Sequence, residues 1–78
     1  PNPFNPATEV SFTLPVDGHV KLSVFNVKGQ EVDVIHEGFQ SSGSHSYTWN
    51  ASNMASGVYY VSLISGTKVK TMKAVLMK

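Results

Sequence analysis

The sequence predicts a small all-β domain, an antiparallel β-sandwich of six to seven strands. Apolar and polar residues alternate with a period of two along most of the chain, and no segment has the spacing of about 3.6 residues that marks an amphipathic helix. Turn-forming residues recur about every 8–12 residues, the spacing typical of a sandwich built from short strands. The single tryptophan, Trp49, ends one of these extended segments, and we expect it in the core.

The composition indicates one domain with a thin stability margin. A chain of 78 residues is short, and a domain of that size buries only about 60% of its unfolded surface. There is no cysteine, so neither a disulfide nor a thiolate metal site reinforces the fold, and the compartment is left open. No apolar run reaches the roughly 18 residues of a membrane span.

Charge is distributed unevenly along the chain. The net charge of +1 argues against a nucleic-acid partner. All five acidic residues lie in residues 1–37, whereas residues 38–78 contain four lysines and no acid. The C-terminal end is therefore a basic strip. The simplest role of lysines on a terminal strand is to block edge-to-edge pairing.

Residues 1–78 are predicted to form a single domain, with residues 1–7 as the end of a proline-rich linker. Three prolines in the first six residues exclude a helix there, and they favour a stiff linker end over a ligand for another module. We expect Phe4 to hold this segment against the domain. The abrupt start at Pro1 suggests a domain cut from a longer protein.

Three strands are predicted before residue 38, over Thr8–Leu14, His19–Asn26 and Glu31–Glu37. The turn before the third strand contains Gly29, placed where a type I turn with a bulge needs a positive φ. Phe25 falls on the outward face, as a contact residue or a lid over a loop. The residues expected to face the core are Val10, Phe12, Leu14, Val20, Leu22, Val24, Val32 and Val34.

A loop over residues 38–43 follows, rich in glycine and serine, with Phe39 as its expected apolar anchor. The next strand, Ser44–Trp49, places His45, Tyr47 and Trp49 on one face. Asn50-Ala51-Ser52 matches the acceptor pattern for N-glycosylation, but Asn50 more simply starts the turn after Trp49.

The apolar run that follows Gly57 predicts the central strand, because only Ser62 interrupts it and such a strand suits packing on both faces. Residues 65–67 form a tight turn, and a last strand runs over Lys68–Lys78. Val69 and Met72 in this last strand are out of phase. We therefore expect a bulge near Thr71.

No motif indicates catalysis, a metal or a cofactor. The three histidines are far apart in the sequence, and no serine lies in a G-x-S-x-G turn. Asp17 and Asn53 have too few carboxylates near them for a calcium site. Exposed rings could bind sugar, with Phe25, Phe39 and one of Tyr59 or Tyr60 as candidates; the core's need for such rings is the simpler explanation.

The ordered motifs of the whole chain resemble a bacterial family of C-terminal immunoglobulin-like domains. The matching segments are Pro1–Thr8, Phe12–Pro15, Val24–Val32 (compare "V-Y-D-x-x-G-x-x-V"), Gly43–Asn50 ("G-x-H-x-x-x-W-D"), Ser56–Tyr60 ("S-G-x-Y") and Lys73–Lys78 ("K-x-x-x-x-K"). Two groups share this pattern, the type A sorting domains of the type IX secretion system and the domain of the flagellar hook-capping protein. The end at Lys78 favours the sorting domain. Asn50 and Ala51 also depart from the acid and glycine that are usual in the hook-capping group.

The resemblance implies a non-catalytic sorting domain that directs a secreted protein to the cell surface or the medium. The implied partners are the secretion machinery of the outer membrane, an upstream cargo domain and surface lipopolysaccharide. We expect the domain itself to be a monomer in isolation. The alternative is an adhesive or carbohydrate-binding accessory module of a secreted polysaccharide-degrading enzyme. The residues expected to serve sorting are Gly57 and Tyr59 for shape, and Lys73, Val75, Leu76 and Lys78 for contact.

Overall fold

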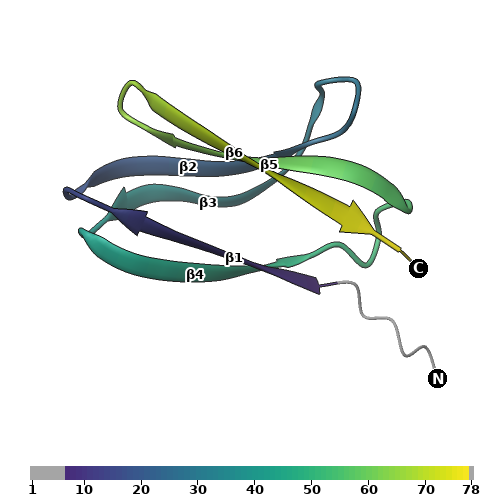
Figure 1. Ribbon diagram of the computed structural model, residues 1–78, viewed down its shortest axis with the longest axis horizontal. Coiled ribbons are helices and arrows are strands. Elements are labelled where there is room, and N and C mark those ends of the chain that lie inside the picture. The colour runs from purple at the N-terminus through teal and green to yellow at the C-terminus, as the bar shows by residue number, and fades with distance from the viewer. Residues whose placement is uncertain (1–6, 78) are drawn as a thin grey trace.

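Six antiparallel strands form two facing sheets in the computed structural model, which describes residues 7–77 (Figure 1). The strands are β1 (Ala7–Leu14), β2 (Gly18–Phe25), β3 (Glu31–Gln40), β4 (Gly43–Asn50), β5 (Gly57–Ser65) and β6 (Lys68–Leu76). One sheet has the order β1-β4, and the other has the order β3-β2-β5-β6. The described residues contain no helix, so the predicted all-β sandwich is confirmed. The expectations for Phe4 and the prolines lie outside the described residues.

The core lies between the two sheets and contains the inward residues of the alternating strands. Val20, Leu22 and Val24 are fully buried, because β2 is an interior strand of the larger sheet. The buried set also includes Val10, Phe12, Leu14, Trp49, Ala51, Tyr59, Val61, Leu63 and Leu76. Period-two alternation therefore predicted the core of β1 and β2 correctly.

Trp49 lies at the centre of this core, as expected, with 2% of its surface exposed. Its indole Nε1–H donates to Asp33 Oδ2 at 2.9 Å, and its ring meets the Tyr59 ring edge-on, with centroids 5.4 Å apart. Buried Trp needs such an acceptor, since an unpaired indole N–H inside the core is costly. The ring is thus a core element and offers no face to a sugar.

β3 differs from the prediction at Val34. This side chain was expected to face the core, but it is 40% exposed, and the partly buried Ile35 packs on the core instead. The reason is a register shift. Leu22 pairs with His36 and Ser23 with Val34, so Ile35 is an extra residue that reverses the alternation. The same shift places Asp33 opposite the inward Val24, so Asp33 faces inward, toward Trp49.

Three further expectations about β3 and the turns have clear outcomes. Phe39 is not an anchor in a loop, because β3 continues to Gln40 and the Phe39 ring is 68% exposed. Gly29 has a φ of 81°, as the predicted turn requires. Asn50 starts a turn, since its Oδ1 accepts the backbone N–H of Ser52 at 3.1 Å.

β6 contains no bulge, contrary to the prediction. Its pairing with β5 continues without a break from Gly57 opposite Leu76 to Ser65 opposite Lys68. Met72, Ala74 and Leu76 face the core, and Val69 is an exposed valine on the outward face rather than a sign of a phase change. β6 is therefore fully paired with β5 along one edge, and no strand within residues 7–77 pairs with its other edge.

β5 has a neighbouring strand on each side, but only one of its faces is packed. It pairs with β2 on one side and β6 on the other, as expected. It is packed on one face, because Tyr59, Val61 and Leu63 face the core whereas Tyr60 and Ile64 are each 37% exposed. No helix within residues 7–77 is long and apolar enough to span a membrane.

Candidate functional site

The last hairpin brings the predicted sorting residues to one end of the molecule. Gly57 pairs with Leu76, Val58 with Val75 and Tyr60 with Lys73, at the end of the sandwich where β6 ends and β1 begins (Figure 1). Tyr59 lies between them and faces the core. Lys78 lies outside the described residues. The register thus places Gly57, Tyr59, Lys73, Val75 and Leu76 within a few residues of one another.

Gly57 and Tyr59 give this end its shape. Gly57 begins β5 with a φ of 150°, a conformation that residues with a Cβ rarely adopt, although a Cβ there would meet no atom within 4 Å. Tyr59 is 8% exposed, and its hydroxyl donates to the Ala55 carbonyl at 2.8 Å. This bond ties the start of β5 to the turn that precedes it.

Lys73 and Val75 are the residues of this set that face outward. Lys73 is exposed, and Val75 is 55% exposed on the outer face of the larger sheet. Leu76, which we expected at a contact surface, is only 4% exposed and packs in the core. Its side chain is therefore not available to a partner while β6 is docked, and it fixes the end of the strand instead.

The lysines of β6 have no carboxylate partner among residues 7–77. The salt bridge in that range joins Lys21 Nζ and Glu31 Oε1 at 3.3 Å. Lys68, Lys70 and Lys73 are all exposed and leave their charge unpaired. The free edge of β6 is consequently both unpaired in its backbone and positively charged.

The outer face of the larger sheet is partly apolar, but its exposed rings do not form one platform. Phe39 pairs with His19 at one end of β2, and Tyr60 pairs with Phe25 at the other end. His19 and Phe25 are six residues apart along β2, which separates the two rings by about 20 Å. Phe39 is therefore too far from the neighbouring Phe25 and Tyr60 for the three rings to form one platform.

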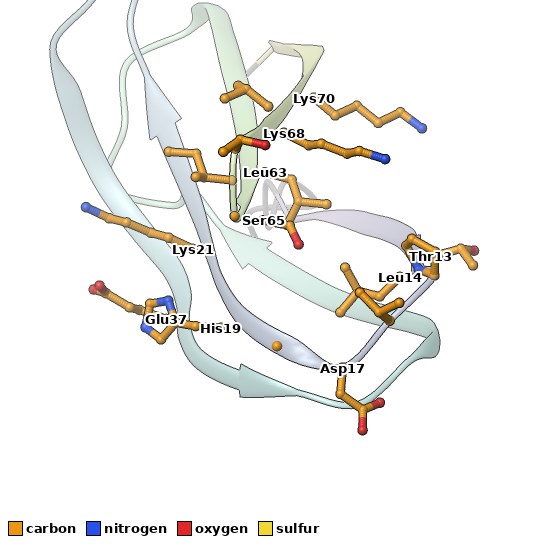
Figure 2. Close-up of a pocket in the computed structure, with 17 residues that line it drawn as sticks. Thr13, Leu14, Asp17, His19, Lys21, Glu37, Leu63, Ser65, Lys68 and Lys70 are labelled. Carbon is orange, nitrogen blue, oxygen red and sulfur yellow. The ribbon is translucent and has the colours of Figure 1, made fainter.

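A groove lies at the opposite end of β6 from the predicted sorting residues (Figure 2). It has a volume of about 1070 Å³ and runs between the β1–β2 turn and the β5–β6 turn. Leu14 and Leu63 line it, and Figure 2 shows Lys68 and Lys70 extending across the hollow from Thr13 and Leu14. Asp17, in the β1–β2 turn, accepts the backbone N–H of Ser42 at 2.6 Å.

Sequence reasoning did not find this groove, because it depends on how far the two-stranded sheet covers the four-stranded one. One signal was present in the sequence. Lys68 and Lys70 have the same parity as the inward residues Met72, Ala74 and Leu76. Two lysines at inward positions indicate that this part of the inner face is open.

The histidines do not form a metal or catalytic centre within residues 7–77. His36 stacks on Tyr47 with ring centroids 4.7 Å apart, and His45 Nε2 lies 2.7 Å from the Ser41 carbonyl oxygen. No group of three or more histidine, cysteine, aspartate or glutamate side chains in this range could hold a metal ion.

Comparison with known families gives one match. The sequence model of a family described as the secretion system C-terminal sorting domain matches residues 1–78. Searches among curated proteins and among solved structures found no significant match. The family match covers the whole chain, including both ends of the last hairpin.

Proposed function

Because this chain belongs to the family of secretion system C-terminal sorting domains, we propose that the export machinery recognises the last hairpin of the fold. A domain of this family is a C-terminal sorting signal of the type IX secretion system, and it marks a protein for export to the cell surface or the medium. The machinery and an upstream cargo are therefore its partners. What remains to be assigned is the surface that carries the signal.

One observation carries the proposal, the free and positively charged edge of β6. A strand at the edge of a sheet presents unpaired backbone groups, and a partner can pair with them by strand addition. β6 is such a strand, and Lys73 and Val75 project from its outer face. These two side chains, with Lys78, supply the contact in our proposal. Leu76 anchors the strand end, and Gly57 and Tyr59 fix its shape.

The domain itself is proposed to be a non-catalytic monomer. Any enzymatic activity then belongs to the cargo, and the domain supplies only the sorting signal. After export, attachment to surface lipopolysaccharide is the final step that we propose for the cargo. No described side chain of the domain is assigned to that step.

Charge reversal at the proposed contact tests the assignment. The domain is fused to a reporter that has a signal peptide and expressed in a host with the type IX system. Lys73→Glu, alone and with Lys78→Glu, should reduce the exported fraction several-fold, because a repulsive charge then faces the partner. The matched control is Lys28→Glu, which makes the same charge change in the exposed β2–β3 turn and should leave export unchanged.

Exposed charges contribute little to stability, so these variants should remain folded. Circular dichroism and the fluorescence of Trp49 verify that. Full export of a folded Lys73→Glu, Lys78→Glu variant would remove this face of β6 from the recognised surface.

A further inference from the structure

We propose that the groove between the β1–β2 turn and the β5–β6 turn binds an extended, acidic segment of a partner protein, which pairs with the free edge of β6. This site includes Lys68 and Lys70 and lies at the other end of β6 from Lys73 and Val75. The two proposals share the free edge of β6 but use different side chains, so the peptide assay and the export assay can fail independently.

The first observation is that the sandwich is open along the first part of β6. The inward residues of β6 become more exposed from the C-terminal end of the strand to its N-terminal end. Leu76 is 4% exposed, Met72 is half-buried, and Lys70 and Lys68 are exposed. The two-stranded sheet therefore does not cover the first part of β6, and the groove lies in this uncovered space.

The second observation is that the groove has apolar lining. Leu14 and Leu63 lie at its base, and both are less than one-tenth exposed. Val16, in the β1–β2 turn, is 67% exposed and forms part of the wall. Apolar side chains on one face of an extended peptide can bury surface here, since alternate residues of a strand point to the same side.

The third observation is the charge at the rim. Lys68 and Lys70 have no carboxylate partner among residues 7–77, and Figure 2 shows them at the side of the groove away from Glu37. Asp17, the other acid in the lining, lies in the β1–β2 turn and accepts the backbone N–H of Ser42. The rim beside the free edge is therefore positive, and the complementary ligand carries carboxylates.

These observations together select the class of partner. Inward lysines on an edge strand repel a neutral or basic strand that approaches the edge, and this is a common means of preventing aggregation. An acidic strand meets no such repulsion, because carboxylates at its inward positions lie beside Lys68 and Lys70 while its backbone pairs with β6. Apolar residues at the other inward positions of the same strand face the open groove.

The test uses the 78-residue chain and a labelled eight-residue peptide that has two glutamates and two valines at alternate positions, with serine between them, so that both residue types lie on one face. Binding is measured by fluorescence anisotropy at low salt. The peptide should bind the chain, and the same peptide with lysine in place of glutamate should not. Alternate N-methylation of the acidic peptide should abolish binding, because it removes backbone donors without changing charge. Titration with salt should weaken binding, since the rim charges are exposed.

Matched variants locate the site. Lys68→Glu with Lys70→Glu should weaken binding by about tenfold or more, because attraction at the rim becomes repulsion. Lys28→Glu lies outside the groove and should have little effect, whereas Lys70→Glu makes the same charge change at the rim and should weaken binding. Val16→Ser should weaken binding by removing part of the apolar wall without adding a charge. Circular dichroism verifies that each variant is folded.

Several results would overturn the proposal. One is equal binding of the N-methylated peptide, which would mean charge attraction without strand pairing. Another is equal binding by the Lys68→Glu, Lys70→Glu variant, which would place the peptide elsewhere. Binding of purified lipopolysaccharide or an anionic polysaccharide, with none of the peptide, would assign the groove to a different ligand. If neither the peptide nor a polysaccharide binds, Lys68 and Lys70 serve only to prevent another strand from pairing with the free edge of β6.

Discussion

At the scale of single residues, two positions explain how the chain fixes its core. Asp33 is an acidic residue in a half-buried strand, and its two oxygens accept the Trp49 indole N–H at 2.9 Å and the Val34 backbone N–H at 2.8 Å. The carboxylate thus satisfies the buried ring and stabilises the local irregularity of β3. Nothing in the local pattern predicts this pair, because the two residues are 16 positions apart.

Gly57 is the other position, and its backbone conformation can be tested alone. A Cβ at Gly57 would meet no atom within 4 Å, so the effect of Gly57→Ala isolates the cost of a φ of 150°. We expect a loss of about 1–3 kcal/mol in the free energy of unfolding, the usual cost of such a backbone region for residues other than glycine. Urea unfolding followed by Trp49 fluorescence measures it.

The matched control is Gly18→Ala. Gly18 also has open space around its Cβ position, but its φ lies outside the positive range. This substitution should change stability by less than about 0.5 kcal/mol. Equal losses at the two positions would contradict the assignment of strain to Gly57.

At the scale of the elements, alternation predicts strands well and their irregularities poorly. The inward faces of β1, β2 and β4 follow from period two, because these strands keep one phase throughout. The phase of β3 changes at Ile35, an extra residue that has no partner in β2. The local sequence does not reveal this change, because Val34 and Ile35 are both apolar and either could face the core. In β6 the sequence predicted a bulge because Val69 is out of phase with Met72, but the strand is regular and Val69 is an exposed residue on the outward face.

The bulge in β3 makes a testable distinction between neighbouring residues. Ile35 packs on the core, and Val34 is 40% exposed. Ile35→Ala should therefore destabilise the domain by about 2 kcal/mol, toward the low end for truncation of a partly buried isoleucine. Val34→Ala should cost less than about 1 kcal/mol. Chemical denaturation of both variants gives the free energies of unfolding. A larger loss of stability for Val34→Ala than for Ile35→Ala would indicate that Val34 faces the core, as the sequence predicted.

The candidate sites show the same limit at the scale of elements. The predicted hairpin brings the start of β5 beside the end of β6. The pairing of Gly57 with Leu76 and of Tyr60 with Lys73 was not predicted, because it needs the unbroken register that β6 has in place of the bulge expected near Thr71. The depth of each side chain was not predictable, because the burial of Leu76 depends on contacts with the opposite sheet. The groove depends on a difference in strand number between the two sheets, which no local pattern reveals.

At the scale of the whole molecule, the architecture explains how a small domain can act as an address without catalytic chemistry. Two strands face four, so the fold has a closed core around Trp49 and leaves β6 with a free edge. The family match over residues 1–78 identifies the domain as a sorting signal. The exposed edge and its unpaired lysines are the features on which a partner can act.

The most direct test of this account transfers the domain to a foreign protein. A reporter with a signal peptide, with and without residues 1–78 at its C-terminus, is expressed in a host with the type IX system and in a matched host lacking it. The fraction of reporter at the surface and in the medium is measured. The account predicts export only when the domain and the system are both present. Retention of the domain-bearing reporter in the competent host, or equal export from the host without the system, would contradict it.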